Sequence, residues 1–339
     1  MTKTLACIAT LALLLAPGLH AQTQTPAPSR VAEIVTLADG VHLLPGRFER
    51  GRQPDGNSLL LDGPEGIVVI DTGRHAEHTQ ALIDFARQGG RPVRAVINTP
   101  WHLDHLGGNL LLRQAWPALE VHASQAIDRA ITGPMVRSQA ELQGLLEGGT
   151  LDAGTRAMVL VDLDLLARRE RLAPDRHIVG ATQGLVLAGR ALRVGVEADA
   201  VSGGDVWVLD RASGTLAAGD FVTLPVPFLD TACAPRWRDA MARLDALPFK
   251  RLVPGHGPVM DRDAFRRYRH ALDRLLACAA GDSPVPVCAA GWIGDLGPLL
   301  PRGEHARASG MLTHYLNQQL RAAPAARDRF CPPTQDTSR

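Results

Sequence analysis

Apolar residues occur in short runs over the first third of the chain, and turn-forming residues separate these runs. Residues 33–46 and 56–73 hold apolar runs interrupted by Asp-Gly and Pro-Glu-Gly, which favour β-hairpins. Residues 67–71 are apolar up to a final acid, as expected of a strand buried on both faces. Residues 76–90 have the apolar spacing of a helix and end in Gly-Gly, and residues 93–99 predict a second buried strand.

The rest of the chain has three further patterns. Residues 125–172 are rich in Leu, Glu, Gln, Arg and Ala, and predict helices that lie over the body. Strands return over residues 184–220, and residues 236–249 predict a helix with one apolar face. Residues 250–257 form one more strand before a glycine-flanked turn, and from Asp261 onward the pattern is mainly helical.

The N-terminus has the pattern of an export signal. Lys3 supplies a positive charge, residues 5–16 form a short apolar run, and small residues precede a cleavage position after Ala21. The run is short for a membrane span, so a retained anchor is the less favoured alternative. A removed signal over residues 1–21 predicts a periplasmic or secreted protein, with no membrane attachment after cleavage.

These patterns divide the chain into four parts. A polar, proline-containing linker over residues 22–29 follows the signal. An α/β body is predicted over residues 30–275, because two strand-rich halves flank the middle helices. A helical C-terminal extension is predicted over residues 276–339.

Composition excludes some classes of partner. The chain has 339 residues, of which 45% are hydrophobic and 21% charged, as expected of a globular protein with a large core. Lys and Arg number 36 against 35 Asp and Glu, so neither nucleic acid nor an anionic membrane is expected to bind. The expected partner is a small-molecule substrate, and the oligomeric state stays open.

Four of the five cysteines remain once Cys7 is removed with the signal. An even number in an exported chain predicts up to two disulfides with three possible pairings. The turn-rich segment between Cys278 and Cys288 favours that pair, which leaves Cys233 to join Cys331. The alternative is four buried free thiols.

Candidate chemistry lies in four loops, each of which follows an apolar strand. Acids and imidazoles at strand ends meet at one edge of a sheet sandwich, and together they suit zinc better than iron or manganese. Neighbouring glycines allow the backbone to approach such a site closely. The residues concerned are Asp71, His102, Asp104, His105, Asp220 and His256.

These motifs resemble the metallo-β-lactamase superfamily, over roughly residues 31–268. The family motif is His-x-His-x-Asp-His, followed downstream by a histidine, an aspartate and a final histidine. The resemblance implies a four-layer αββα sandwich with two metals at one edge, which activate water to attack a carbonyl or phosphoryl centre.

Carried over by position, one metal site is complete. Asp104, His105 and His256 would form the second metal site, and Asp220 would be the acid that bridges both metals. Asp71 matches a family aspartate that orients the ligand loops through hydrogen bonds rather than binding metal.

The first metal site departs from the family pattern. Only His102 remains of its three histidines, because Pro100 occupies the first position and offers no ligand atom. Counting back from Asp205, the commoner spacing places Val201 at the third position, and a register two residues longer places Asp199 there. The acidic end of that strand favours Asp199 as a ligand, with Val201 as the alternative.

We therefore expect an exported metal-dependent hydrolase with one zinc ion, two being the alternative. A single zinc ion provides a water nucleophile at neutral pH. That water would attack the carbonyl of an ester, thioester, lactone or lactam, with Asp104 or Asp220 as the catalytic group that orients it. A different class of function is a catalytically degenerate periplasmic binding protein on the same scaffold.

Overall fold

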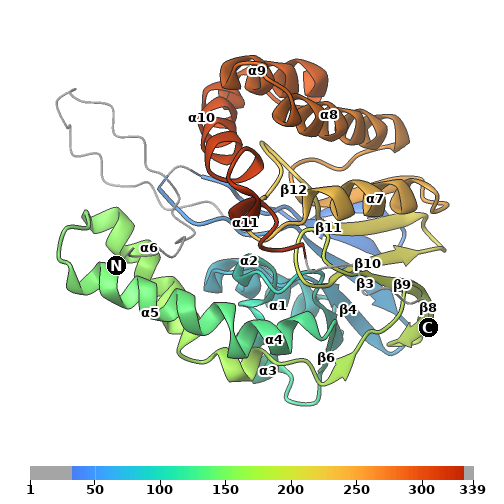
Figure 1. Cartoon of the computed structure of the whole chain (residues 1–339). Coiled ribbons are helices and arrows are strands. Elements are labelled where there is room, and N and C mark those ends of the chain that lie inside the picture. The colour runs from blue at the N-terminus through green and yellow to red at the C-terminus, as the bar shows by residue number, and fades with distance from the viewer. Residues whose placement is uncertain (1–32, 50, 332–339) are drawn as a thin grey trace, which may run out of the picture.

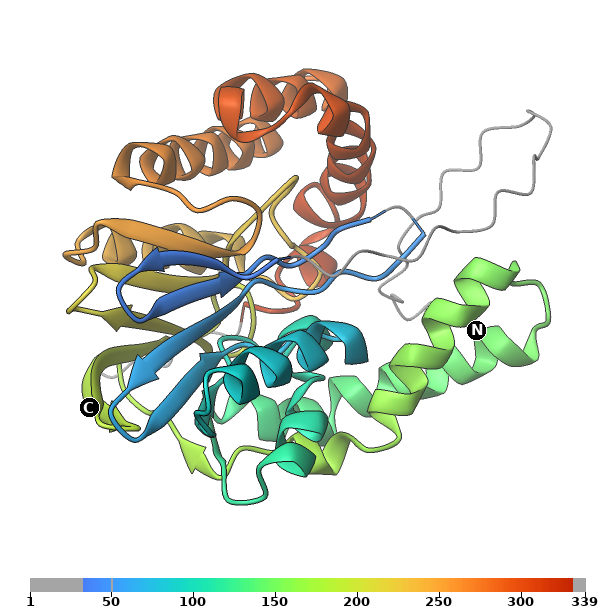
Figure 2. The same ribbon diagram turned by 180° about the vertical axis from the view of Figure 1, so that it is seen from behind.

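The computed structural model describes residues 33–49 and 51–331, which form two β-sheets packed face to face with helices on both outer faces (Figures 1 and 2). This arrangement confirms the predicted αββα sandwich with a helical C-terminal region. The predicted export signal over residues 1–21 and the linker over residues 22–29 lie outside the described residues.

The first sheet has seven strands in the order β1 to β7. Neighbouring strands from β1 to β4 are antiparallel, and those from β4 to β7 are parallel. Parallel strands need crossover connections, and helices supply these. The strands are β1 (Val35–Ala38), β2 (Val41–Leu44), β3 (Ser58–Gly63), β4 (Gly66–Ile70), β5 (Val93–Ile97), β6 (Glu120–Ala123) and β7 (Arg176–His177).

Strands β3 and β4 are buried on both faces, as the unbroken apolar runs predicted. Successive side chains of a strand point to opposite faces. Leu59 and Leu61 therefore pack between the two sheets, whereas Leu60 packs beneath the outer helices. Likewise, Val68 packs between the two sheets and Val69 packs beneath the outer helices. Each of these strands thus joins two layers of core.

The second sheet has five strands in the order β12-β11-β10-β9-β8. Strands β11 and β12 are parallel, and the remaining pairs are antiparallel. The inner face of this sheet packs against β2 to β5 of the first sheet through a shared apolar core. The strands are β8 (Gln183–Leu187), β9 (Arg190–Glu197), β10 (Asp205–Asp210), β11 (Thr215–Thr223) and β12 (Arg251–His256).

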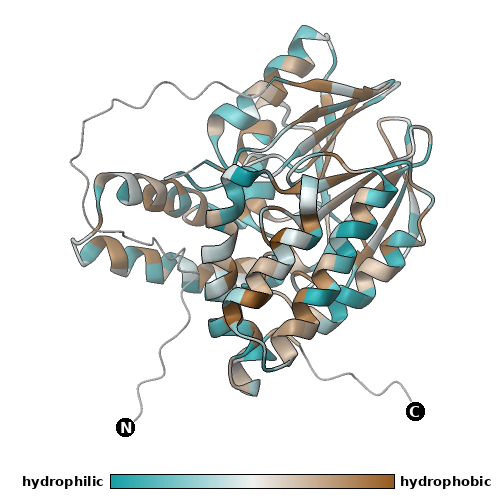
Figure 3. Cartoon of the chain, turned by 90° about the horizontal axis from the view of Figure 1, so that it is seen from above, coloured by the Kyte–Doolittle hydropathy of each residue, from teal (hydrophilic) through white to brown (hydrophobic). Residues whose placement is uncertain are grey.

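Helices cover the outer faces, and their apolar sides face the sheets. Figure 3 shows the strands mainly apolar and the surface helices mixed in hydropathy. The first sheet is covered by α1 (Ala76–Gln88) and α3 (Asn109–Ala115), with the one-turn helix α2 (Leu103–Leu106) between them in the chain. The second sheet is covered by α7 (Ala234–Asp245), α8 (Arg262–Ala280), α9 (Val285–Leu296) and α10 (His305–Tyr315).

The C-terminal helices share one core with the second sheet. The predicted boundary after residue 275 falls inside α8, and Leu272 and Ala279, on either side of it, belong to the same core. Trp292 of α9 also lies in this core and donates a hydrogen bond from Nε1 to the Pro225 carbonyl at 2.9 Å. The shorter terminal elements are η2 (Gly297–Leu299), η3 (Arg302–Glu304), η4 (Leu316–Leu320) and α11 (Pro324–Arg327).

The middle helices extend from the body on the side of the first sheet (Figure 1). They are α4 (Ala126–Thr132), α5 (Pro134–Glu147), α6 (Ala153–Leu166) and the short η1 (Arg169–Leu172). Leu165 and Leu166 of α6 pack with Leu106 of α2 in a separate apolar cluster. The middle helices therefore reach the loop that carries the predicted ligands.

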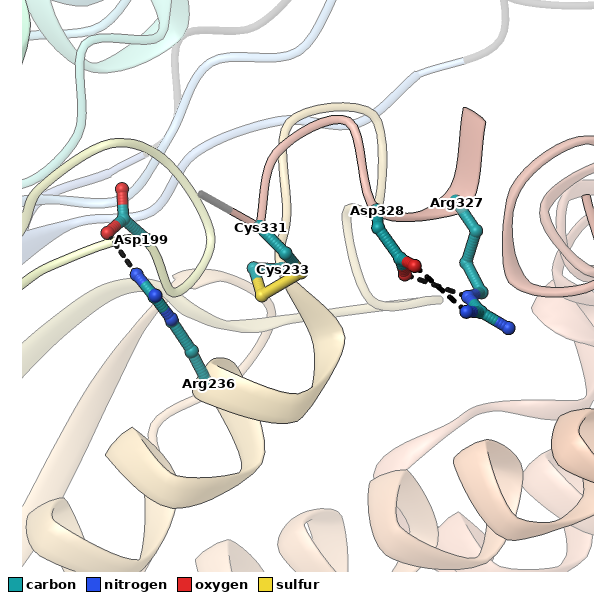
Figure 4. Close-up of a disulfide and its surroundings, with 6 residues drawn as sticks. All are labelled: Asp199, Cys233, Arg236, Arg327, Asp328 and Cys331. Carbon is teal, nitrogen blue, oxygen red and sulfur yellow. Dashed lines mark hydrogen bonds and ion pairs between the residues drawn. A yellow bond between two sulfur atoms is a disulfide. The ribbon is translucent and has the colours of Figure 1, made fainter. Parts of the chain in front are cut away.

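Both predicted disulfides are present. Cys233 is joined to Cys331 (Figure 4), and Cys278 is joined to Cys288. The first bond ties the end of the described chain to the N-terminus of α7, and the second joins α8 to α9. Among the described residues, no helix has the length and apolar character needed to cross a membrane.

Helix α1 docks on β3 through a buried histidine. His78 Nε2 lies 2.8 Å from Ser58 Oγ, and burial lowers the pKa of His78 to about 4. Gly73 allows this contact, because its φ is +78° and a Cβ atom there would lie 2.4 Å from His78 Cδ2. His78 is therefore neutral at neutral pH.

The low pKa of His78 predicts a loss of stability in weak acid. As the pH falls below 6.5, the unfolded chain takes up a proton that folded His78 accepts only near pH 4. The stabilisation is complete above pH 6.5, and about 2 kcal/mol of it is lost by pH 5. Urea unfolding at pH 7 and pH 5 measures the free energy of unfolding at each pH. The decrease between the two pH values should be smaller in His78→Gln than in the wild type, by about 2 kcal/mol.

A matched control for this measurement is His270→Gln, an exposed position on α8. Its free energy of unfolding should decrease between pH 7 and pH 5 by the same amount as that of the wild type. An equal loss in all three chains would contradict the assignment to His78.

Candidate metal centre

Four segments deliver polar side chains to one edge of the sandwich. Asp71 directly follows β4, Asp220 lies in β11, and His256 is the last residue of β12. Strands β11 and β12 are parallel, so their two side chains reach the same edge. The loop after β5 leads into α2, which presents Asp104 and His105 in its single turn.

Four histidine–carboxylate pairs at this edge lie at distances close to those between ligands of one metal ion. His105 Nε2 is 3.1 Å from Asp220 Oδ1 and 3.7 Å from Asp104 Oδ2. His256 Nε2 is 2.9 Å from Asp104 Oδ2 and 3.6 Å from Asp220 Oδ1. Ligands bound tetrahedrally to zinc at about 2.0–2.1 Å are about 3.4 Å apart. The observed distances are centred on this value.

Two of these atoms have no hydrogen-bond partner among the described residues. His105 Nε2 and Asp220 Oδ1 are both buried, and each points toward the other ligand atoms. Buried polar atoms without a partner are costly, so an ion between them would remove this cost. Asp104, His105 and His256 offer ligand atoms that all lie within 4.8 Å of one another. The residues present therefore fit one divalent metal.

Asp71 holds the His105 ring in the orientation that metal binding needs. His105 Nδ1 lies 2.8 Å from Asp71 Oδ2, so the ring directs Nε2 toward the site. Asp71 also accepts hydrogen bonds from Thr99, at 2.8 Å from its N–H and 2.6 Å from its hydroxyl. Its backbone is left-handed, with φ of 58°, which is uncommon for a non-glycine residue.

Gly56 allows a second loop to cover His105 from the other side. A Cβ atom at this position would lie 2.5 Å from His105 Cε1, so only glycine fits without displacing the ring. The Gly56 N–H also donates to the Asp104 carbonyl at 2.9 Å. The backbone therefore packs directly against both ligand residues.

The electrostatic field at the centre favours positive charge. Burial alone would lower the pKa of His105, but the carboxylates of Asp220, Asp71 and Asp104 raise it well above its ordinary value. Burial alone would raise the pKa of Asp104, but His105, His256 and nearby Arg74 hold it below its usual range. The pKa of Asp220 is likewise held low by His105 and His102 against the effect of burial. The acids are therefore ionised, as metal ligands must be.

Sequence reasoning missed a buried arginine beside the ligands. Arg74 Nη2 lies 3.7 Å from Asp104 Oδ1, and its Nη1 donates to Asp162 of α6. The Arg74 N–H donates to Asp55 Oδ1 at 2.7 Å. The position of Arg74 shortly after Asp71 was a weak signal, and nothing in the sequence indicated its partner 88 residues away.

His102 is placed at the edge of the group rather than within it. Its Nδ1 is 2.6 Å from Asp220 Oδ2, the oxygen that faces away from His105. Its Nε2 is 3.1 Å from Thr231 Oγ1. The rings of Trp101 and Phe228 lie against it edge-on, at centroid distances of 5.0 and 4.8 Å.

Within the described residues, the metal-spaced group of Asp104, His105 and His256 does not include the predicted ligand Asp199. Asp199 forms an ion pair with Arg236 of α7, and its side chain is 25% exposed (Figure 4). Val201, the alternative, has an apolar side chain buried in the core of the second sheet, and its carbonyl accepts a hydrogen bond from Thr231. Neither position provides a ligand beside His102.

Comparison with known families gives one match over most of the sandwich. The sequence model of the metallo-beta-lactamase superfamily matches residues 51–256. A metallo-beta-lactamase from Pontibacter korlensis is similar in fold, with a TM-score of 0.53 and 20% identity, over 71% of this chain and 98% of that one. The mono-zinc form of the metallo-beta-lactamase FIM-1 from Pseudomonas aeruginosa has a TM-score of 0.52 and 14% identity, over 70% and 94%.

Two characterised proteins match shorter segments. An (R)-specific secondary-alkylsulfatase from Pseudomonas sp. is 32% identical over 91 residues, which is 26% of this chain and 14% of that protein. A linear primary-alkylsulfatase from Pseudomonas sp. (strain ATCC 19151) is 30% identical over 50 residues, 14% of this chain and 10% of that protein. The matched segments are thus a small part of each alkylsulfatase.

Replacing Asp71 tests the role of its hydrogen bonds. Asp71→Asn is expected to weaken zinc binding about 10–100-fold, because an amide cannot accept hydrogen bonds at both positions from Thr99 and His105. Calorimetric titration of the metal-free protein with zinc measures this change. Asp263→Asn, on a side chain that is 93% exposed, is the matched control and should bind like the wild type. Unchanged affinity in Asp71→Asn would contradict the role.

Proposed function

Because the chain belongs to the metallo-β-lactamase superfamily, we propose that it is a metal-dependent hydrolase that works with a single metal ion. The observation that carries this proposal is the group of ligand atoms from Asp104, His105 and His256, with Asp220 Oδ1 3.1 Å from His105 Nε2 and 3.6 Å from His256 Nε2. When bound, a zinc ion in such a group supplies a water nucleophile at neutral pH and polarises a substrate oxygen.

The exposure of the ligand side chains supports access of substrate and water to the centre from one side. The His105 side chain is fully buried and that of Asp220 is 4% exposed, whereas those of Asp104 and His256 are 10% and 12% exposed. Substrate and water would therefore reach the centre past Asp104 and His256. Asp104 is the more accessible carboxylate, so we assign it the role of accepting the proton from the attacking water. We assign Asp220 the role of orienting the other groups of the site.

The surroundings of the centre supply apolar walls. Phe48 lies beside His256 with ring centroids 6.3 Å apart, and the Arg307 guanidinium of α10 stacks over Phe48 at 4.0 Å. Trp101 and Phe228 flank His102 on the other side. Apolar walls with a few polar groups at the base are typical of small-molecule sites.

The proposed substrates are carbonyl compounds: esters, thioesters, lactones or lactams. The short matches to two alkylsulfatases add sulfate esters to the compounds that need testing. The two disulfides support export to an oxidising compartment, periplasmic or extracellular.

Removal and return of metal tests the proposal on one panel: a p-nitrophenyl ester, a thioester, a lactone, a chromogenic β-lactam and an alkyl sulfate. Turnover of at least one compound should fall about 100-fold or more after chelation and return with zinc. His105→Ala and His256→Ala should show a similar loss, because each removes a ligand. His270→Ala, exposed on α8, is the control and should retain the wild-type rate.

Two results would contradict the proposal. Turnover that survives chelation would show that the reaction does not use the metal. Zinc binding without turnover of any compound on the panel would favour a binding protein on the hydrolase scaffold.

A further inference from the structure

The first metal position of the family does not fit a metal in this chain. Pro100 and Val201 provide no ligand, and Asp199 is held by Arg236. Of the family's ligand positions for this metal, only His102 and Asp220 hold side chains that could bind it, two ligands where zinc in proteins normally takes four. His102 Nδ1 and Asp220 Oδ2 are 2.6 Å apart, which is a short hydrogen bond and clearly less than the roughly 3.4 Å between two ligands of one zinc ion.

We propose that His102 is a positioning residue that takes the place of the first metal. It donates from Nδ1 to Asp220 Oδ2 and thereby turns Oδ1 of the same carboxylate toward His105 and His256. Asp220 then serves one metal instead of bridging two. This inference rests on the proposed function only in assuming that a metal binds at Asp104, His105 and His256.

Thr231 fixes the His102 ring from its other nitrogen. The Thr231 hydroxyl donates to the Val201 carbonyl at 2.7 Å, and its oxygen lies 3.1 Å from His102 Nε2. Both ring nitrogens thus have partners. The carbonyl of Val201, one of the two candidates for the family's third ligand position, anchors this chain of contacts.

The C-terminal helices hold the loop that carries Thr231. Its neighbour Asp230 accepts hydrogen bonds from Tyr315 at 3.1 Å and from Gln319 at 2.7 Å. Cys233, two residues after Thr231, forms a disulfide with Cys331. The alignment of His102 therefore depends on residues that lie outside the part of the chain matched to the family.

Metal counting on three variants of the full chain tests this inference. Elemental analysis after zinc loading and dialysis should find one zinc per chain in the wild type, in His102→Ala and in His102→Asn. His102→Ala should weaken zinc binding about 10–100-fold in calorimetric titration, because Asp220 loses its support. His102→Asn should recover most of the affinity, because its amide N–H occupies the place of Nδ1 and still donates to Asp220.

Thr231→Val provides a milder change that keeps the histidine. It should leave one zinc per chain and weaken binding by a smaller factor than His102→Ala. Thr132→Val, at an exposed position of α4, is the matched control and should not change the affinity. Circular dichroism shows whether each variant is folded, and Thr231→Val keeps the test open if His102→Ala does not fold.

The outcomes separate this inference from the proposed function. Two zinc ions per chain in the wild type, with one lost in both His102 variants, would overturn the positioning role and leave a two-metal hydrolase. Equal affinity in wild type, His102→Ala and Thr231→Val would also overturn it. The expected zinc counts and affinities without any turnover would reject the hydrolase and leave the role of His102 intact. A folded chain that binds no zinc would overturn both.

Discussion

The structure depends on the burial of three carboxylates, Asp71, Asp104 and Asp220, around the His105 imidazole. Ionised acids buried without positive charge are strongly unfavourable, so the fold must bring cationic or hydrogen-bonding partners to each. Asp71 is satisfied by His105 and by Thr99. The remaining carboxylate atoms face a space in which His105 Nε2 and Asp220 Oδ1 have no partner among the described residues. A divalent cation at this position would meet the requirement.

Distant parts of the chain serve the same requirement. The middle helices bring Asp162 to Arg74, which lies beside Asp104 and offsets part of the negative charge. The C-terminal helices and the Cys233–Cys331 disulfide hold the loop that aligns His102 with Asp220. One addition thus supports Asp104 through Arg74, and the other supports Asp220 through His102. In the proposed single-metal centre, the hydrogen bond from His102 would keep Asp220 in place.

Much of this site was predictable because its residues lie near the ends of buried strands. An acid or imidazole in or shortly after the last part of such a strand lies near the sheet edge, so Asp104, His105, Asp220 and His256 were identified from local pattern and family resemblance. Asp199 was not predictable in this way, because its place depends on a left-handed turn and on an ion pair with Arg236, 37 residues away. Partners of this kind, such as Arg74 with Asp162, leave no local pattern. The disulfides were predictable because the cysteines were few.

The most direct test of a single-metal centre is the position of zinc in crystals of the loaded protein. Anomalous difference density at the zinc absorption edge should show one peak per chain, between His105 Nε2 and His256 Nε2 and within bonding distance of Asp104 and Asp220. His102 Nδ1 should remain hydrogen-bonded to Asp220. A second peak bonded to His102 Nδ1, or no peak between the two histidines, would contradict the account.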